Sequence, residues 1–363
     1  MPKRGAAPTR ITSTVLFARN PPLDKLEFPE ARKCSELMVG PRSRRVEMMI
    51  GTAGPLVTVA PEHIGHTLHS PLAPALSGEH LSVASAAGRV HAYVAGRGRP
   101  LLLIHSVNAA ASAAEVRPLH DYFQRSRRVF SIDLPGFGLS ERADRRYTPQ
   151  LMTKAIRAVV AAISARHPGP IDALALSLSS EFLARAAVER PNAFRSLAFV
   201  SPTGFSGHRA LRERPGTLRG SPVLYSMLRR AGCGTAIFKI LTRPGMIRRF
   251  LRRTWGSKNI DERLWHYDML TVRLPGAAFA PLYFMSGQLF SADIHRIYEH
   301  LPMPVWSTHG VRGNAIDYRQ EHILDKHANW RFSVFQSGAF PHFEKSTEFC
   351  AHYEQFLSAH VPA

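Results

Sequence analysis

The fold is decided by the stretch IDALALSLSS at residues 171–180, which is followed directly by EFLARAA at residues 181–187. The apolar run from Ile171 to Leu176 has the length and composition of a buried strand. Ser177 then stands between small residues, and the amphipathic spacing after it is typical of a helix. A strand, a sharp turn and a helix in this order place the Ser177 hydroxyl at the apex of the turn. The small side chains of Ala175 and Ser179 allow the strand and the helix to pass close to each other.

The segments on either side of this stretch alternate between strand and helix patterns. A period of two around Ala87-Gly88 predicts a hairpin, and Pro100 to Ser106 begins as a continuous apolar run typical of a buried parallel strand. Alternation at this spacing predicts an α/β protein with a mostly parallel, doubly wound sheet. The further strands are expected at 128–133, 196–200, 304–310 and 330–335, and helices at 111–124, 150–166 and 346–360.

Two regions interrupt the alternation and divide the chain. Residues 1–75 are expected to be a disordered or loosely packed basic extension, because their apolar residues follow no sustained period. Residues 206–295 are Arg-rich and helical in pattern, and we interpret them as a helical lid inserted into the core. The core is then made of residues 76–205 and 296–363.

Composition limits the classes of function. The chain has 363 residues, of which 45% are hydrophobic, so it can bury a sizeable core. Its 3 cysteines are far apart and match no zinc or disulfide spacing, which favours a reducing, cytoplasmic location and no metal. The sequence contains no uninterrupted run of about 18 apolar residues, so we expect no membrane-spanning helix. The net charge is +20, but no nucleic-acid-binding motif is present, so we expect no nucleic acid partner.

The expected lid carries the sharpest charge asymmetry. From Ser206 to Trp255 there are twelve Lys and Arg residues against Glu213 alone, a net charge of +11. Apolar and basic residues interleave at helical spacing in 236–241 and 246–253. One interpretation is a peripheral contact with an anionic membrane, which would make the protein membrane-peripheral. The other is a cap whose arginines face water above a substrate pocket.

Four signatures in order resemble those of the α/β-hydrolase superfamily, over roughly residues 79–360. The first and second are the strand ending LIHS at 103–106 and the run DLPGFGLS at 133–140. The third is Ser177, which resembles the nucleophile elbow G-x-S-x-G with Ala175 and Ser179 in the glycine positions. The fourth joins the strand from Pro304 to Gly310 with the loop GAFPHFE at 338–344. The resemblance implies an α/β-hydrolase fold with a lid after the strand that ends at Val200.

The resemblance also implies a serine hydrolase that needs no metal or organic cofactor. Ser177 would attack an acyl carbonyl, and a histidine would carry the proton. The backbone N–H groups of Leu178 and of Val107 or Asn108 would form the oxyanion hole. The small-molecule substrate would be an ester or thioester with a lipophilic acyl group. His105 and Asp133 are expected to order loops rather than to react.

The chain departs from the superfamily at the base and at the acid. Aligned on the family pattern, the histidine position is Ala339 and the acid position is Gly313. His342 is the histidine of that loop and is our candidate base. Asp317 is the candidate acid, because the order nucleophile, acid, base is kept, and Asn314 is an alternative orienter.

These departures leave two other functions open. The first is a catalytically weak or inactive α/β-hydrolase fold that serves as a binding or accessory protein. The second is non-hydrolytic chemistry in the same fold, such as that of a lyase or cyclase, because a fold does not fix a reaction.

Overall fold

The computed structural model describes residues 72–230, 232–313 and 317–359. The expected extension therefore lies outside the described residues, except for its last four positions. Those positions pack on the core: Leu72 and Ala75 are buried, and the Ala75 N–H donates to the Tyr93 hydroxyl at 3.0 Å. The Tyr267 hydroxyl donates to the carbonyl of Ala73 at 2.8 Å. The packed part of the chain thus includes residues from Leu72 on, earlier than the boundary expected near residue 75.

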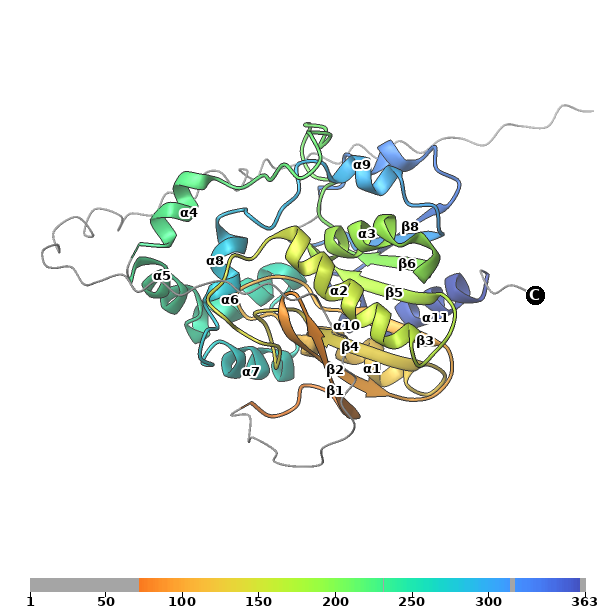
Figure 1. Cartoon of the computed structure of the whole chain (residues 1–363), viewed down its shortest axis with the longest axis horizontal. Coiled ribbons are helices and arrows are strands. Elements are labelled where there is room, and N and C mark those ends of the chain that lie inside the picture. Colours follow the sequence, from red (N-terminus) through yellow and green to blue (C-terminus); the bar gives the residue numbers. More distant parts are fainter. Residues whose placement is uncertain (1–71, 231, 314–316, 360–363) are drawn as a thin grey trace, which may run out of the picture. The chain divides into compact units, whose positions relative to one another are not determined.

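The core is one eight-stranded sheet in the order β1-β2-β4-β3-β5-β6-β7-β8 (Figure 1). β1 pairs antiparallel with β2, and β2 pairs antiparallel with β4. All remaining neighbours are parallel. The expected fold class is thereby confirmed. The strands are β1 (Glu79–Ser85), β2 (Gly88–Ala95), β3 (Pro100–Ile104), β4 (Arg128–Asp133), β5 (Ile171–Leu176), β6 (Phe194–Val200), β7 (Val305–Gly310) and β8 (Trp330–Phe335).

Successive residues of the central strands feed two hydrophobic clusters. In β3, Leu102 and Ile104 belong to the cluster on one face of the sheet, and Leu101 and Leu103 belong to the cluster on the other. This is the period of two that a strand imposes. Both faces are buried, which explains why the central strands are continuous apolar runs.

Helices cover both faces of the sheet. α2 (Pro149–Ser164), α3 (Ser179–Glu189) and α9 (Ile294–Glu299) contribute to the first cluster. α1 (Arg117–Phe123) and α11 (Ser346–Ser358) contribute to the second cluster. α10 (Pro341–Glu344) contacts the helices α1 and α11. Figure 1 shows α2 and α3 running over the strands on one side of the sheet. The helix predicted at 111–124 is divided into a 3₁₀ turn at Ala113–Val116 and α1, because Pro118 starts a new helix.

A helical segment separates β6 from β7. It contains α4 (Pro222–Leu228), α5 (Cys233–Leu241), α6 (Pro244–Trp255), α7 (Glu262–Thr271), α8 (Phe279–Met285) and then α9. We call residues 206–295 the lid, as defined above. A bidentate ion pair from Arg117 to Asp261 at 2.9 Å fixes the start of α7 to the core. Buried Glu181 of α3 accepts from Arg219 at 2.6 Å and from the Ser291 N–H at 2.8 Å. No helix of the described residues is both long and apolar enough to cross a membrane.

Candidate functional site

Ser177 lies at the turn between β5 and α3. Its φ of +50° is in the left-handed region, which residues with a β-carbon rarely adopt. The Ser177 N–H donates to the Val200 carbonyl at 2.8 Å, and the Ser180 N–H donates to the Ser177 carbonyl at 3.1 Å. All other residues from Ile171 to Ala184 are buried. Ser177 is therefore the one half-buried residue of this stretch, and the turn leaves it partly accessible.

A second serine provides a comparison within the same chain. Ser201 follows β6 and also has a positive φ, of +49°. Its side chain is buried, and its hydroxyl donates to the Ala339 carbonyl at 2.7 Å. The Ser177 hydroxyl has no such partner among the described residues. Ser177 is thus the strained serine whose hydroxyl is available.

The replacements for the two glycines of the elbow each have a structural explanation. Ala175 is buried in β5, where its methyl group belongs to the core. Ser179 is buried at the start of α3, and its hydroxyl donates to the His105 carbonyl at 2.5 Å. Because this buried hydroxyl is satisfied, Ser179 ties the elbow to the loop after β3.

That loop, residues 105–116, is organised by one buried carboxylate. Glu115 accepts from the Ser106 N–H at 2.7 Å and from the Asn108 side-chain amide at 2.7 Å. His105 accepts from the Leu134 N–H at 2.9 Å through Nε2, while its Nδ1 lies 2.5 Å from the Ser106 carbonyl. Both ring nitrogens of His105 are occupied, so this histidine fixes the loop, as expected from the sequence.

Two backbone amides at the elbow and in this loop are uncommitted. The N–H groups of Ser106 and Ser177 donate hydrogen bonds. Within the described residues, the N–H groups of Val107 and Leu178 donate none. Leu178 precedes the first turn of α3, where the helix dipole favours negative charge. These are the two amides that the sequence proposed for the oxyanion hole.

His342 is buried in α10 and has one hydrogen bond. Its Nε2 lies 2.8 Å from the Glu115 carbonyl, so a proton on Nε2 donates to that oxygen. Its Nδ1 has no partner within the described residues. Phe340, Phe343 and Phe349 surround the ring, and burial lowers the pKa of His342 to about 4. No hydrogen bond joins His342 to Ser177 or to Asp317 within the described residues.

Asp317 lies in a different environment. Its carboxylate accepts from Arg319 at 2.7 and 2.6 Å and from the Gly207 N–H at 2.9 Å. Hydrogen bonding from Arg319 holds the pKa of Asp317 well below its usual range. The structure thus places Asp317 with the first residues of the lid rather than with His342. Asn314, the alternative orienter, lies outside the described residues.

The C-terminal end of α6 packs against both positions where the superfamily has its acid and its base. The Ala339 N–H donates to the Thr254 carbonyl at 2.8 Å. Gly313 has φ of +97°, and a β-carbon there would lie 2.6 Å from the same Thr254 oxygen. A β-carbon on Gly338 would lie 2.3 Å from the Trp255 carbonyl oxygen. Backbone of the lid therefore fills the space that an acid at 313 would need, and it also holds the backbone of Ala339 through a hydrogen bond.

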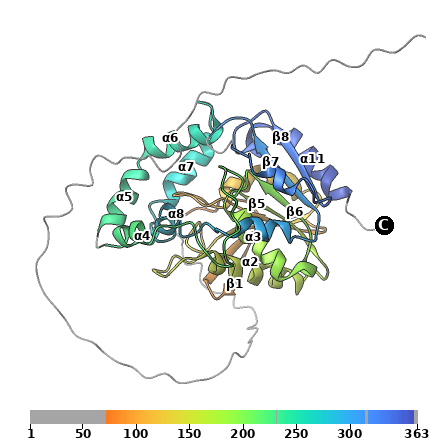
Figure 2. The same ribbon diagram turned by 90° about the horizontal axis from the view of Figure 1, so that it is seen from above.

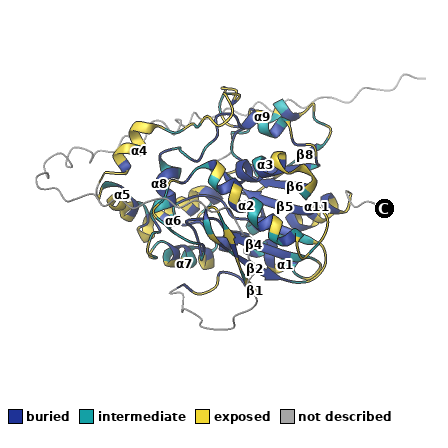
Figure 3. Cartoon of the chain, in the orientation of Figure 1, coloured by how far each residue is buried: buried dark blue, intermediate teal, exposed yellow. Residues whose placement is uncertain are grey.

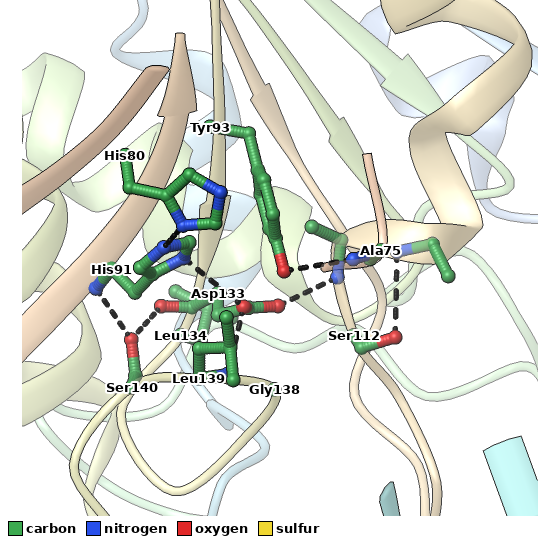
Figure 4. Close-up of polar contacts among 12 residues, drawn as sticks. Ala75, His80, His91, Tyr93, Ser112, Asp133, Leu134, Gly138, Leu139 and Ser140 are labelled. Atoms are coloured by element: carbon green, nitrogen blue, oxygen red, sulfur yellow. Dashed lines mark hydrogen bonds and ion pairs between the residues drawn. The ribbon is translucent and has the colours of Figure 1, made fainter. Parts of the chain in front are cut away.

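Asp133 orders the loop after β4 (Figure 4). Its carboxylate accepts from the Ala113 N–H at 2.7 Å and from the Leu139 N–H at 2.8 Å, and His91 Nδ1 lies 3.5 Å away. Burial raises the pKa of Asp133, but hydrogen bonding and positive potential from His91 and His105 outweigh it, and the net shift is downward. Asp133 is therefore charged, and it connects the loop after β4 to the loop after β3. It is a structural residue, as the sequence suggested.

Two other buried acids lie near the loop after β3. Burial raises the pKa of Glu115 to about 7, against the hydrogen bonds from Ser106 and Asn108. Burial also raises the pKa of Asp268 in α7, with repulsion from Glu115 and Asp261. Sequence reasoning did not identify Glu115, because an acid inside an apolar helical run has no partner that spacing alone could assign. Among the described residues, no group of three or more His, Cys, Asp and Glu could hold a metal ion.

The chain resembles solved structures, whereas no protein-family model and no curated protein sequence matches it. A serine hydrolase involved in carbazole degradation (the CarC enzyme) has a TM-score of 0.61 at 15% identity, covering 78% of this chain and 100% of its own. A thermophilic esterase from Thermogutta terrifontis has a TM-score of 0.60 at 17% identity, with coverages of 78% and 100%.

A third similar structure is a membrane phospholipase A described as a bacterial virulence factor. Its TM-score is 0.60 at 19% identity, and the match covers 78% of this chain and 87% of its own. At 15–19% identity, these matches show a shared fold and no more. The strand order, the turn at Ser177 and these matches agree that the chain has the α/β-hydrolase fold.

Proposed function

We propose that this protein is a serine-nucleophile hydrolase of an ester or thioester with a lipophilic acyl group. The observation that carries the proposal is the backbone of Ser177, which is held at φ of +50° in a stretch where Ser177 is the one residue that is not fully buried. A non-glycine residue in this region costs about 1–3 kcal/mol, and such strain is concentrated at functional sites. Esterases, a serine hydrolase and a phospholipase among the similar structures support hydrolysis as the class of reaction.

In the proposed mechanism, the Ser177 hydroxyl attacks the acyl carbonyl carbon and the alcohol or thiol departs. The negative oxygen of the tetrahedral intermediate accepts from the N–H groups of Leu178 and Val107. Water then attacks the acyl-enzyme by the reverse sequence and releases the acid. Removal of one oxyanion donor lowers the rate of such reactions by about 100-fold or more.

His342 is the proposed base, and a backbone carbonyl orients its ring in place of the carboxylate that does so in a Ser-His-Asp triad. Its Nε2 proton is held by the Glu115 carbonyl, which leaves the Nδ1 lone pair as the acceptor for the Ser177 proton. A carbonyl does not stabilise an imidazolium as a carboxylate does, so we expect slow turnover. Because the pKa of His342 is about 4, the base is neutral at every pH above about 5. The rate should then be flat between pH 5 and 8, with no rise near pH 6.5.

One observation favours the second candidate, a catalytically weak or inactive binding protein. The end of α6 fills the space beside Gly313, so the usual acid could not be accommodated there unless α6 moved. If the lid keeps this position, substrates would bind at the elbow without proton transfer.

Hydrolysis of short p-nitrophenyl esters and thioesters separates the two candidates. The hydrolase proposal predicts slow turnover that Ser177→Ala abolishes and His342→Gln lowers, with unchanged melting temperature for Ser177→Ala. Turnover that survives Ser177→Ala would refute the nucleophile assignment. Absence of turnover in the unaltered protein, together with saturable binding of the ester, would select the binding protein.

A further inference from the structure

Exposed large apolar side chains are concentrated on three consecutive helices of the lid. Ten such residues occur in the described chain, and six of them lie between residues 222 and 250. Val223 is 71% exposed and Met227 is 49% exposed, both on α4. Figure 3 shows α4 as an almost continuously exposed helix. The full set is Val223, Leu224, Met227, Ile240, Met246 and Phe250.

The exposed faces of α5 and α6 repeat one arrangement of side chains. On α6 the exposed residues Met246, Arg249, Phe250 and Arg253 are spaced i, i+3, i+4 and i+7, which places them on one stripe of a helix. On α5 the exposed residues Ala236, Lys239 and Ile240 are spaced i, i+3 and i+4, and exposed Arg243 lies between α5 and α6. In both stripes apolar residues occupy i and i+4 and a basic residue occupies i+3, and on α6 a second basic residue occupies i+7.

The opposite faces of these helices are accounted for by packing. Ile247, Leu251 and Trp255 of α6 are at most 3% exposed and belong to the core cluster beneath the lid. Phe238 of α5 is also buried. The helices are therefore already docked through one apolar face, and the exposed apolar residues form a second face that belongs to neither hydrophobic cluster of the described residues.

The charge around this second face is mainly positive. Residues 214–260 contain eleven Lys and Arg residues and no Asp or Glu. Arg229 pairs with Asp144, and Arg248 pairs with Glu262. Lys239, Arg243 and Arg249 form no salt bridge within the described residues, and Arg252 lies close enough to Glu262 to help lower the pKa of that carboxylate. α4 contacts α5 and α5 contacts α6, so the three helices follow one another along one part of the molecule (Figure 2).

From these observations we propose that the outer faces of α4, α5 and α6 form a docking surface for an anionic lipid bilayer. Apolar side chains at i and i+4 enter the boundary between headgroups and acyl chains, and the basic residues beside them contact lipid phosphates. A nucleic acid would satisfy the cations but would leave Val223, Met246 and Phe250 in water. The proposal does not depend on the proposed hydrolysis, because none of these side chains belongs to the elbow.

Vesicle co-sedimentation of the full chain tests this surface. The probes are vesicles of phosphatidylcholine alone and of phosphatidylcholine mixed with phosphatidylglycerol, at low and high salt. We expect binding to the anionic vesicles that weakens with salt. Lys239→Gln with Arg249→Gln should lower the partition coefficient by about fivefold for each cation removed. Phe250→Ser should lower it by about tenfold or more.

Matched controls lie on exposed positions elsewhere. Lys154→Gln with Arg331→Gln removes two exposed charges, and Val334→Ser removes an exposed apolar side chain. Neither control should change binding, and Ser177→Ala should bind as the unaltered protein does, which separates docking from catalysis. Equal binding to both kinds of vesicle, or none, would overturn the proposal. So would a Phe250→Ser variant that binds normally and is displaced by duplex DNA, because the surface would then recognise any polyanion.

Discussion

The substitution Gly313→Ala tests whether the end of α6 fills the position of the usual acid. A β-carbon at Gly313 would lie 2.6 Å from the Thr254 carbonyl oxygen and 3.0 Å from that of Arg253. The substitution combines two costs. Alanine at φ of +97° strains the backbone by about 1–3 kcal/mol, and forcing α6 away adds about 1–3 kcal/mol of overpacking.

Gly169→Ala is the matched control for the backbone cost. Gly169 has a similar φ of +105°, but a β-carbon there would meet no atom within 4 Å. It should lower the stability by the strain alone. For a chain of this size, 1 kcal/mol corresponds to a change in melting temperature of about 2–4 °C. Gly313→Ala should therefore melt about 2–12 °C below Gly169→Ala.

Differential scanning calorimetry measures the two melting temperatures, and hydrogen exchange locates the disturbance. Gly313→Ala should speed exchange at the Ala339 amide, whose acceptor is the Thr254 carbonyl, whereas Gly169→Ala should not. Equal melting temperatures for the two variants, with unchanged protection at Ala339, would refute the packing of α6 against the acid position.

Two other predictions concern the histidine and the acid. His342 has a pKa of about 4 when folded against about 6.5 when unfolded, so the unfolded chain binds more protons between these values. Stability should fall by about 3 kcal/mol as the pH drops from 6.5 to 4, and His342→Gln should remove this part of the loss in urea titrations compared at each pH. Asp317→Asn should change ester hydrolysis less than His342→Gln does, because Asp317 contacts Arg319 and Gly207 rather than His342. A loss of rate in Asp317→Asn as large as that in His342→Gln would place Asp317 in the proton relay.

Much of the fold could be predicted from the sequence because local pattern and packing agree. Pro100–Ile104, Ile171–Leu176 and Trp330–Phe335 are strands in the structure at the expected places. Each is a short apolar or alternating run bounded by turn residues, and their order determines the sheet. The elbow followed from one serine between small residues, and the value of φ at Ser177 bears out its strained turn.

The surroundings of the candidate base could not be predicted in the same way. They depend on contacts between residues far apart in the sequence, such as His342 with Glu115 and Gly313 with the end of α6. Spacing placed His342 in the loop after β8 but could not tell which partner its ring would meet. Glycine at 313 and alanine at 339 looked like missing catalytic groups in the sequence. The structure explains the glycine, because the Thr254 carbonyl is packed against it, but it shows no contact that requires alanine at 339.

Covalent labelling of Ser177 tests the central claim most directly. A fluorophosphonate probe reacts with a serine only when its hydroxyl is activated and the oxyanion hole is formed. We predict one adduct per chain, located on Ser177 by peptide mass spectrometry, absent in Ser177→Ala and formed more slowly in His342→Gln. No adduct on the folded protein, or an adduct on Ser201 instead, would contradict the assignment of Ser177 as the nucleophile.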